Sequence, residues 1–240
     1  MTDAITLLGA SLRSDAEVLR VTGQNLANVQ TPGYRREISV LQSGFDAVAM
    51  RGIADAASLV APVMQAATDF GTGPLQQSPG PWHVALEGAG YFVLNTPTGE
   101  QVTRRGDFSL DSSGRLVSQE GFPVLGDGGE ITPPDGVPTI DADGTIHLNG
   151  QVVDRLRRVT ADPHALTAAG QSRFAPTSGT VLTDTTSGSV RQGFIESSNV
   201  TPAEELLRLM ETMRHFEMTQ HFVRGAHEML GDAISTLGKV

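Results

Sequence analysis

Apolar residues recur at alternating steps of three and four along both ends of the chain. The C-terminal series is Leu206, Leu209, Met213, Phe216, Gln220, Val223, His227, Leu230, Ile234 and Leu237. The N-terminal series is Ile5, Leu8, Leu12, Asp15, Leu19, Thr22, Leu26 and Val29. This spacing places each series on one face of a helix, and a single helix cannot bury such a stripe against itself. The pattern predicts two terminal helices whose stripes pack on each other, on another subunit or on both.

Punctuating residues set the expected ends of these helices. The N-terminal helix is expected over about residues 3–28, because Pro32 and Gly33 do not continue a helix. The C-terminal helix is expected from Pro202, which suits the first helical position, to Leu237, which precedes Gly238. Ordinary amphipathic helices of one globular core show the same spacing, so that alternative remains open.

The middle of the chain changes to a strand pattern. Short apolar runs such as Tyr91–Leu94 alternate with glycines at positions 99, 106, 114, 121 and 128. Such spacing is typical of a meander of tight hairpins. The predicted fold class is therefore α+β, with long terminal helices forming a coiled-coil-like domain and a central all-β domain of hairpins.

The expected organisation has five parts. They are an N-terminal helix and motif at 1–36, an extended connector at 37–81, a central β domain at 82–185, a return segment at 186–200 and a C-terminal helix at 201–240.

Composition narrows the function. The 240 residues include 17 Lys and Arg against 27 Asp and Glu, a net charge of −10 that repels polyanions, so nucleic acid is not an expected partner. No run of about 18 apolar residues predicts membrane insertion. The first residues lack the pattern of a cleaved signal, so we expect any export to leave the chain uncleaved. The chain has no cysteine, and this excludes disulfides and thiolate chemistry.

The motifs that suggest chemistry are incomplete. His227 and Glu228 begin like a zinc-protease helix, but Gly231 stands where the second His ligand is needed. Gly88-Ala89-Gly90 lacks the rest of a dinucleotide fingerprint, and Asp141-Ala142-Asp143-Gly144 lacks the later ligands of a calcium loop. We therefore expect no enzyme activity, no cofactor and no metal site. His227 and Gln220 are interpreted as polar positions that set helix register.

Two short motifs resemble those of a known family, the axial proteins of the bacterial flagellum and in particular the basal-body rod proteins. The N-terminal signature consists of Asn25, Leu26, Ala27, Asn28, Thr31, Pro32, Gly33 and Tyr34, and Arg35 follows it. The C-terminal signature consists of Ser198, Asn199, Val200, Pro202 and Glu205. Further similar stretches lie at 69–78, 86–93, 103–108 and 121–126, so the resemblance covers nearly the whole chain. The compact middle is more similar to the proximal than to the longer distal rod protein.

This resemblance implies a structural subunit of the rod in the periplasm, exported by the flagellar type III apparatus. Its implied partners are copies of itself, other rod proteins, the export machinery and, as a further contact, the surrounding ring proteins. The self-assembly interface is expected to be the two apolar series given above without Asp15 and Thr22. The alternative from another class is a secreted β-domain module that binds cell-wall glycan and is oligomerised by its helices.

Overall fold

A computed structural model describes residues 2–42 and 63–237, and the chain divides into two compact units. The first, which we call the helical unit, comprises Met1–Ala27, Glu37–Asp69 and Thr201–Val240. The second, the β unit, comprises Asn28–Arg36 and Phe70–Val200. Residues 43–62 of the expected connector and the last three residues lie outside the described residues.

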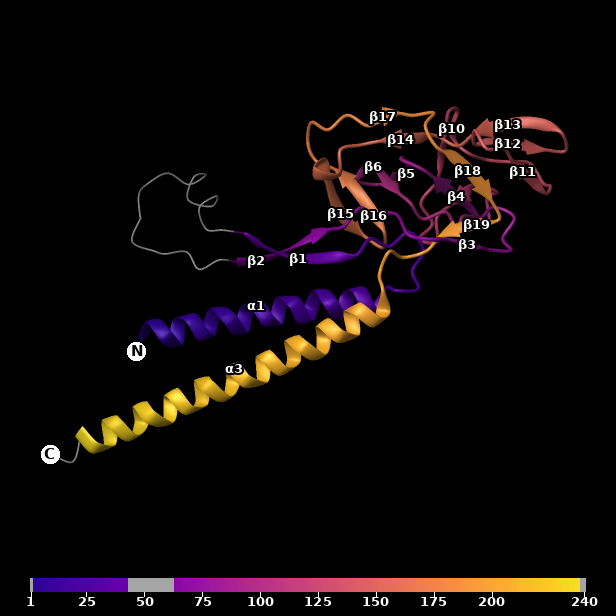
Figure 1. Ribbon diagram of the computed structural model, residues 1–240. Coiled ribbons are helices and arrows are strands. Elements are labelled where there is room, and N and C mark those ends of the chain that lie inside the picture. The colour runs from indigo at the N-terminus through magenta and orange to yellow at the C-terminus, as the bar shows by residue number, and fades with distance from the viewer. Residues whose placement is uncertain (1, 43–62, 238–240) are drawn as a thin grey trace. The chain divides into compact units, whose positions relative to one another are not determined.

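The helical unit contains two long helices and a two-stranded ribbon. Helix α1 spans Thr2–Ala27 and helix α3 spans Pro202–Leu237, so they measure about 39 and about 54 Å at the standard rise per residue. Strands β1 (Glu37–Gln42) and β2 (Val63–Thr68) pair antiparallel, with Glu37 opposite Thr68. Helix α1 lies between α3 and this ribbon and packs against both (Figure 1).

The expected coiled-coil-like domain is wrong. Helix α1 packs against both α3 and a β ribbon, whereas a helix of a coiled coil packs against other helices only. On α3 the predicted stripe positions Leu206 and Met213 are 45 % and 48 % exposed, while Glu205 and Thr219 are buried. The helices therefore pack through a face rotated from the predicted one. Hydrophobicity alone misplaced the centre of the packing face, because it does not predict buried polar side chains that find hydrogen-bond partners.

Two glycines inside α1 give a direct stability prediction. A Cβ atom built on Gly9 or Gly23 meets nothing within 4 Å. Because glycine in a helix costs roughly 1 kcal/mol relative to alanine, Gly9→Ala is expected to stabilise the helical unit by up to about 1 kcal/mol. The measurement is the urea midpoint followed by far-UV circular dichroism, and an unchanged or lower midpoint would contradict the expectation. Gly33→Ala is expected to have the opposite effect on the β unit, because Gly33 has a φ of 63° and its added Cβ would lie 2.6 Å from the Arg105 nitrogen.

The β unit is built from short strands and one turn of 3-10 helix. Its elements are β3 (Leu75–Gln77), β4 (Val84–Glu87), β5 (Tyr91–Thr96), β6 (Gly99–Thr103), β7 (Ser109–Leu110), β8 (Leu116–Val117), β9 (Leu125–Gly126), β10 (Gly129–Glu130), β11 (Pro138–Ile140), β12 (Thr145–Leu148), β13 (Gln151–Arg155), β14 (Arg158–Thr160), η1 (Pro163–Ala165), β15 (Leu166–Gly170), β16 (Arg173–Pro176), β17 (Thr183–Asp184), β18 (Ser189–Gln192) and β19 (Phe194–Glu196). The largest sheet has six antiparallel strands in the order β15-β16-β6-β5-β14-β17. A three-stranded sheet, β11-β12-β13, and four strand pairs complete the unit.

Strand β5 is buried on both faces and separates two apolar clusters. Phe92 and Leu94 belong to a larger cluster that also contains Trp82. Tyr91 and Val93 belong to a smaller one on the other face. This alternation explains why Tyr91–Leu94 reads as a continuous apolar run, since both sides of the strand face core.

The chain returns late to close the β unit. Strand β18 pairs with β4 and β19 pairs with β3, so residues near 190 complete pairs that begin near residues 75 and 84. Both pairs are antiparallel. The segment that follows, 197–200, carries part of the C-terminal signature.

Candidate assembly site: the signature residues and the helix faces

The N-terminal signature forms a tight turn directly after α1. The Thr31 amide donates to the Asn28 carbonyl at 3.0 Å, and the Tyr34 amide donates to the Thr31 carbonyl at 3.3 Å. At Gly33 the backbone is left-handed, and its amide donates to the Glu196 carbonyl at 2.7 Å. Only glycine fits at this position of the turn, because an added Cβ would clash with the Arg105 backbone.

Asn199 of the C-terminal signature connects this turn to the returning chain. Its Oδ1 accepts from the Arg36 amide at 2.6 Å, its Nδ2 donates to the Gly71 carbonyl at 2.9 Å, and its amide donates to the Tyr34 carbonyl at 3.4 Å. Ser198 is buried beside it, and its Oγ accepts from the Val200 amide at 3.2 Å. Parts of both signatures therefore meet in the β unit.

A buried cluster of charges lies beneath this turn. Arg35 Nη1 lies 2.7 Å from Glu196 Oε1, and Arg104 Nη1 lies 3.4 Å from Glu196 Oε2. The side chains of Arg35 and Glu196 are each 1 % exposed and that of Arg104 is 5 % exposed. Glu196 Oε1 also accepts from the Gly73 amide at 2.9 Å. One carboxylate therefore serves two guanidinium groups and a backbone amide.

The remaining donors of the two arginines are only partly matched. Arg104 donates to the carbonyls of Leu86 and Gly88 at 3.3 and 2.6 Å, and Arg35 donates to Gly71 at 2.6 Å. Among the described residues, the donors Arg35 Nε, Arg35 Nη2 and Arg104 Nε are buried and have no hydrogen-bond acceptor. Such a cluster costs desolvation energy and specifies geometry more than it stabilises, but loss of its only carboxylate would leave two buried charges.

Ionisation in this cluster follows burial. Burial lowers the pKa of the Arg104 guanidinium, and the charge of Glu196 opposes that shift. Burial also raises the pKa of the Tyr91 phenol, against the opposing charges of Arg35 and Arg104. The Arg104 guanidinium lies 5.3 Å from the centre of the Tyr91 ring, a cation–π distance.

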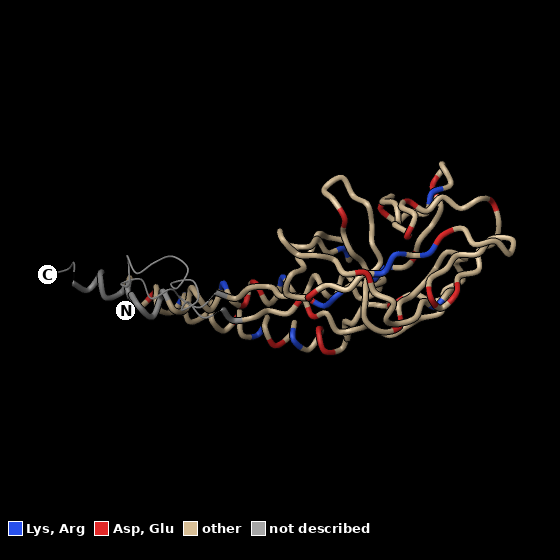
Figure 2. Tube along the Cα trace, turned by 90° about the horizontal axis from the view of Figure 1, so that it is seen from above, with Lys and Arg blue, Asp and Glu red and all other residues tan. Residues whose placement is uncertain are grey.

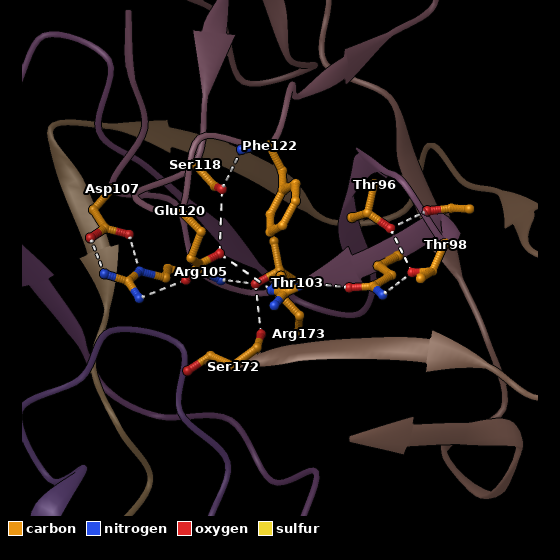
Figure 3. A network of polar contacts seen from close by, with 12 residues as sticks. Thr96, Thr98, Thr103, Arg105, Asp107, Ser118, Glu120, Phe122, Ser172 and Arg173 are labelled. Carbon is orange, nitrogen blue, oxygen red and sulfur yellow. Dashed lines mark hydrogen bonds and ion pairs between the residues drawn. The ribbon is translucent and has the colours of Figure 1, made fainter. Parts of the chain in front are cut away.

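The next residue, Arg105, enters a separate and more exposed network (Figure 3). It binds both carboxylate oxygens of Asp107, at 2.7 and 3.0 Å, and lies 3.4 Å from Glu120. Arg173 joins the same Glu120 at 3.3 Å and stacks 4.6 Å from the centre of the Phe122 ring. The adjacent arginines thus anchor different parts of the β unit, Arg104 the buried cluster and Arg105 this network.

The signatures also meet in the helical unit, through Asn25 and Glu205. Both residues are 1 % exposed. Asn25 exchanges two hydrogen bonds with the Glu37 backbone, each 2.8 Å long, and its Nδ2 lies 3.3 Å from Glu205 Oε2. One amide side chain therefore ties α1 to the start of β1 and to α3.

The helix faces differ from the predicted stripes. Leu209, Phe216 and Val223 are half-buried, and so are Leu8, Leu12, Leu19, Leu26, Val29 and Gln220. Asp15, a polar break in the N-terminal stripe, pairs with His215 on α3 at 2.7 Å. His227 contacts the Val223 carbonyl of its own helix at 2.9 Å. The side chains of Ile5, Leu230, Ile234 and Leu237 lie outside the described ones.

Sequence reasoning overlooked the three residues of the charged cluster. Arg104 lies within one of the similar stretches, Arg35 directly follows the N-terminal signature and Glu196 lies two residues before the C-terminal one, but the sequence analysis assigns none of them a role. The sequence signal that could have indicated this cluster was Glu196 itself, because its carboxylate directly follows the apolar pair Phe194-Ile195. A charge at such a place needs a partner if it faces inward.

Charged residues of both signs are interspersed along the described chain (Figure 2). Within residues 2–42 and 63–237, no helix has the length and apolarity needed to cross a bilayer.

Comparison with known proteins identifies the family. Residues 85–152 match the model of the flagellar hook protein FlgE/F/G D1 domain, and residues 191–236 match that of the flagellar basal body rod FlgEFG protein C-terminal region. The chain is 32 % identical over 225 residues to the flagellar basal-body rod protein FlgF of Mesorhizobium japonicum, covering 92 % of this chain and 91 % of that protein. It is 33 % identical over 229 residues to FlgF of Salmonella typhimurium, covering 89 % of each. To FlgG of Buchnera aphidicola subsp. Schizaphis graminum it is 29 % identical over 240 residues, covering 88 % of this chain and 91 % of that protein.

The chain therefore belongs to the flagellar basal-body rod proteins, as the signature motifs predicted. Membership places it in the rod of the flagellar basal body. Its relatives are structural proteins rather than enzymes, which agrees with the expected lack of catalysis.

Proposed function

We propose that this chain is a structural subunit of the rod that is exported through the flagellar type III apparatus and polymerises in the periplasm through its terminal helices. Its neighbours are copies of itself and other rod proteins, and the assembled rod transmits torque. Family membership supports the structural role. The higher identity to the relatives named FlgF than to the one named FlgG supports a proximal position in the rod.

The observation that best supports polymerisation through the terminal helices is the exposed apolar surface of α3. Seven large apolar side chains on this helix are between 45 % and 68 % exposed: Leu206, Leu207, Met210, Met213, Met218, Phe222 and Met229. Scattered apolar residues are ordinary on a protein surface, but a series along one long helix is typical of an interaction site. The relatives are rod proteins, and this favours assembly over a glycan-binding module.

The proposed interface combines two kinds of predicted residue. Leu206 and Met213 are exposed and available to a neighbour, whereas Leu209, Phe216 and Val223 are half-buried and hold the helical unit together. Folding and assembly are therefore linked, because the half-buried residues hold α3 in the position from which the exposed ones can contact a neighbour.

The double substitution Leu206→Asp, Met213→Asp tests this proposal. Both side chains are about half exposed, so the folded helical unit is expected to survive, but two carboxylates would be buried at each contact. We expect the variant to be exported at the level of the unaltered chain and to be lost from purified basal bodies by at least tenfold. Immunoblots of basal bodies and of the exported fraction measure both.

The matched control is Val181→Asp, which also places a carboxylate at an exposed apolar residue, 79 % exposed and in the β unit. It is expected to assemble normally. Normal motility and incorporation of the double variant would refute assembly through α3.

A further inference from the structure

Four of the seven methionines of the chain lie on one helix, α3. They are Met210, Met213, Met218 and Met229. Their side chains are between 48 % and 68 % exposed, although methionine is among the residue types that folded proteins most often bury. Of the other three, Met64 is half-buried in β2, and Met1 and Met50 lie outside the described residues. Solutes therefore have access to the α3 methionines in the unassembled chain.

The four side chains do not belong to the contact between α3 and α1. Phe216 is half-buried and marks the side of α3 that packs against α1. At 100° per residue, three of the methionines lie roughly 120–160° around the helix from Phe216, namely Met210, Met218 and Met229. Met213 lies about 60° from it, at the edge of the packed side. The methionines thus form part of the surface that the proposed function assigns to neighbouring subunits.

The chemistry of this surface is that of the thioether. The chain contains no cysteine, so methionine supplies all of its sulfur. A lone pair on the thioether sulfur attacks one oxygen of hydrogen peroxide, the O–O bond breaks, a sulfur–oxygen bond forms and water leaves. The sulfur is oxidised and the peroxide is reduced. The product, methionine sulfoxide, is a polar and chiral side chain in place of a flexible apolar one.

We propose that the exposed methionines of α3 make the entry of this chain into the rod sensitive to peroxide, an inference that rests on the proposed function. An oxidised side chain has to lose the water on its sulfoxide oxygen when a neighbour covers it. A polar group that is buried without a partner is expected to weaken association about tenfold. Because four such positions lie on one helix, partial oxidation of each chain is sufficient.

The sensitivity is confined to the time before assembly. A neighbour that covers the methionines removes them from water, and peroxide that arrives later no longer reaches the sulfur atoms. Methionine sulfoxide is reversible, since methionine sulfoxide reductases restore the thioether. Oxidised subunits are thus excluded from the rod, whereas subunits already in the rod are protected.

A competition inside one cell tests this proposal. The unaltered chain is produced together with a differently tagged variant that carries four substitutions: Met210→Leu, Met213→Leu, Met218→Leu and Met229→Leu. Exchange of methionine for leucine conserves volume and apolarity, so the variant is expected to assemble normally without oxidant. Hydrogen peroxide is then added while basal bodies form. Both chains meet the same oxidant, so damage to other components affects them equally.

We expect peroxide to lower the ratio of unaltered chain to variant in purified basal bodies about tenfold, while the ratio in the exported fraction stays constant. Immunoblots against the two tags measure both ratios. The matched control is Met64→Leu alone, which changes a half-buried methionine of β2 and is expected to give no protection.

Mass spectrometry of the unaltered chain gives a measurement that does not depend on the variant. We expect sulfoxide at the four α3 positions in the exported, unassembled chain and almost none in the incorporated chain. Isolated basal bodies that are treated with the same peroxide are expected to keep their thioethers.

The opposite results separate the two proposals. An unchanged ratio in basal bodies, or equal sulfoxide in incorporated and unassembled chain, would overturn the peroxide sensitivity and leave the proposed function intact. Absence of sulfoxide from the exposed positions of the exported chain would do the same. Absence of the unaltered chain from basal bodies without any peroxide would instead refute the proposed function.

Discussion

Glu196→Gln is expected to lower the free energy of unfolding of the β unit by about 3–5 kcal/mol, because a buried pair loses its only carboxylate. Arg35 and Arg104 would then keep their charges in a site where both are almost completely buried. The single tryptophan, Trp82, is buried in the larger apolar cluster and reports on this unit. Urea unfolding followed by its fluorescence measures the loss.

The control for this variant is Asp127→Asn. Asp127 pairs with Arg155 at 2.6 Å, but the side chains are 47 % and 45 % exposed, and exposed pairs contribute at most about 1 kcal/mol. The two variants remove the same charge from an Arg–carboxylate pair and differ in burial. Equal losses for both would show that the buried cluster has no special part in holding the β unit together.

Asn25→Asp is expected to destabilise the helical unit by about 3 kcal/mol at neutral pH. The substitution keeps the shape of the side chain but removes the donor to the Glu37 carbonyl and to Glu205. It also places a second carboxylate beside the buried Glu205. Hydrogen exchange of the α1 and α3 amides measures the change in opening free energy for this unit.

The pH dependence of this loss has a definite sign. Burial and a neighbouring carboxylate both raise the pKa of the new carboxyl group in the folded state above its unfolded value. The folded state then binds the proton more tightly, so part of the lost stability returns as the pH falls below about 6 toward the unfolded pKa. A loss that stays constant over this interval would argue against a buried carboxylate.

Asn95→Asp is the matched control. Asn95 Nδ2 also donates to a glutamate, Glu130, at 2.9 Å, but this contact is exposed. The same substitution there is expected to cost less than about 1 kcal/mol.

Local signals in the sequence were sufficient for the regular elements. Helix α3 occupies Pro202–Leu237, the same residues that the capping pattern and the stripe predict. The glycine spacing between residues 99 and 128 corresponds to turns between short strands. These features depend on residues close together in the chain, and propensity and periodicity describe such residues well.

Contacts between distant residues were not accessible in this way. The coiled-coil expectation failed in part because Glu205 and Thr219 are buried, and the burial of Glu205 depends on a distant partner. Asn25, which lies 180 residues earlier in the chain, donates a hydrogen bond to the buried Glu205 carboxylate. Strands β1 and β2 were missed for a similar reason, since each is stabilised by its pairing with the other and by α1. Glu196 was missed because its two arginines lie in separate motifs.

The late closure of the β unit constrains when it can form. Glu87 and Ser189 face each other across β4 and β18 although 102 residues separate them, so two early strands lack their partners until the chain is nearly complete. Loop-closure entropy makes such distant pairing slow. A polypeptide that ends before residue 189 therefore leaves β3 and β4 without their partners, so the β unit is completed only when its last two strands are present.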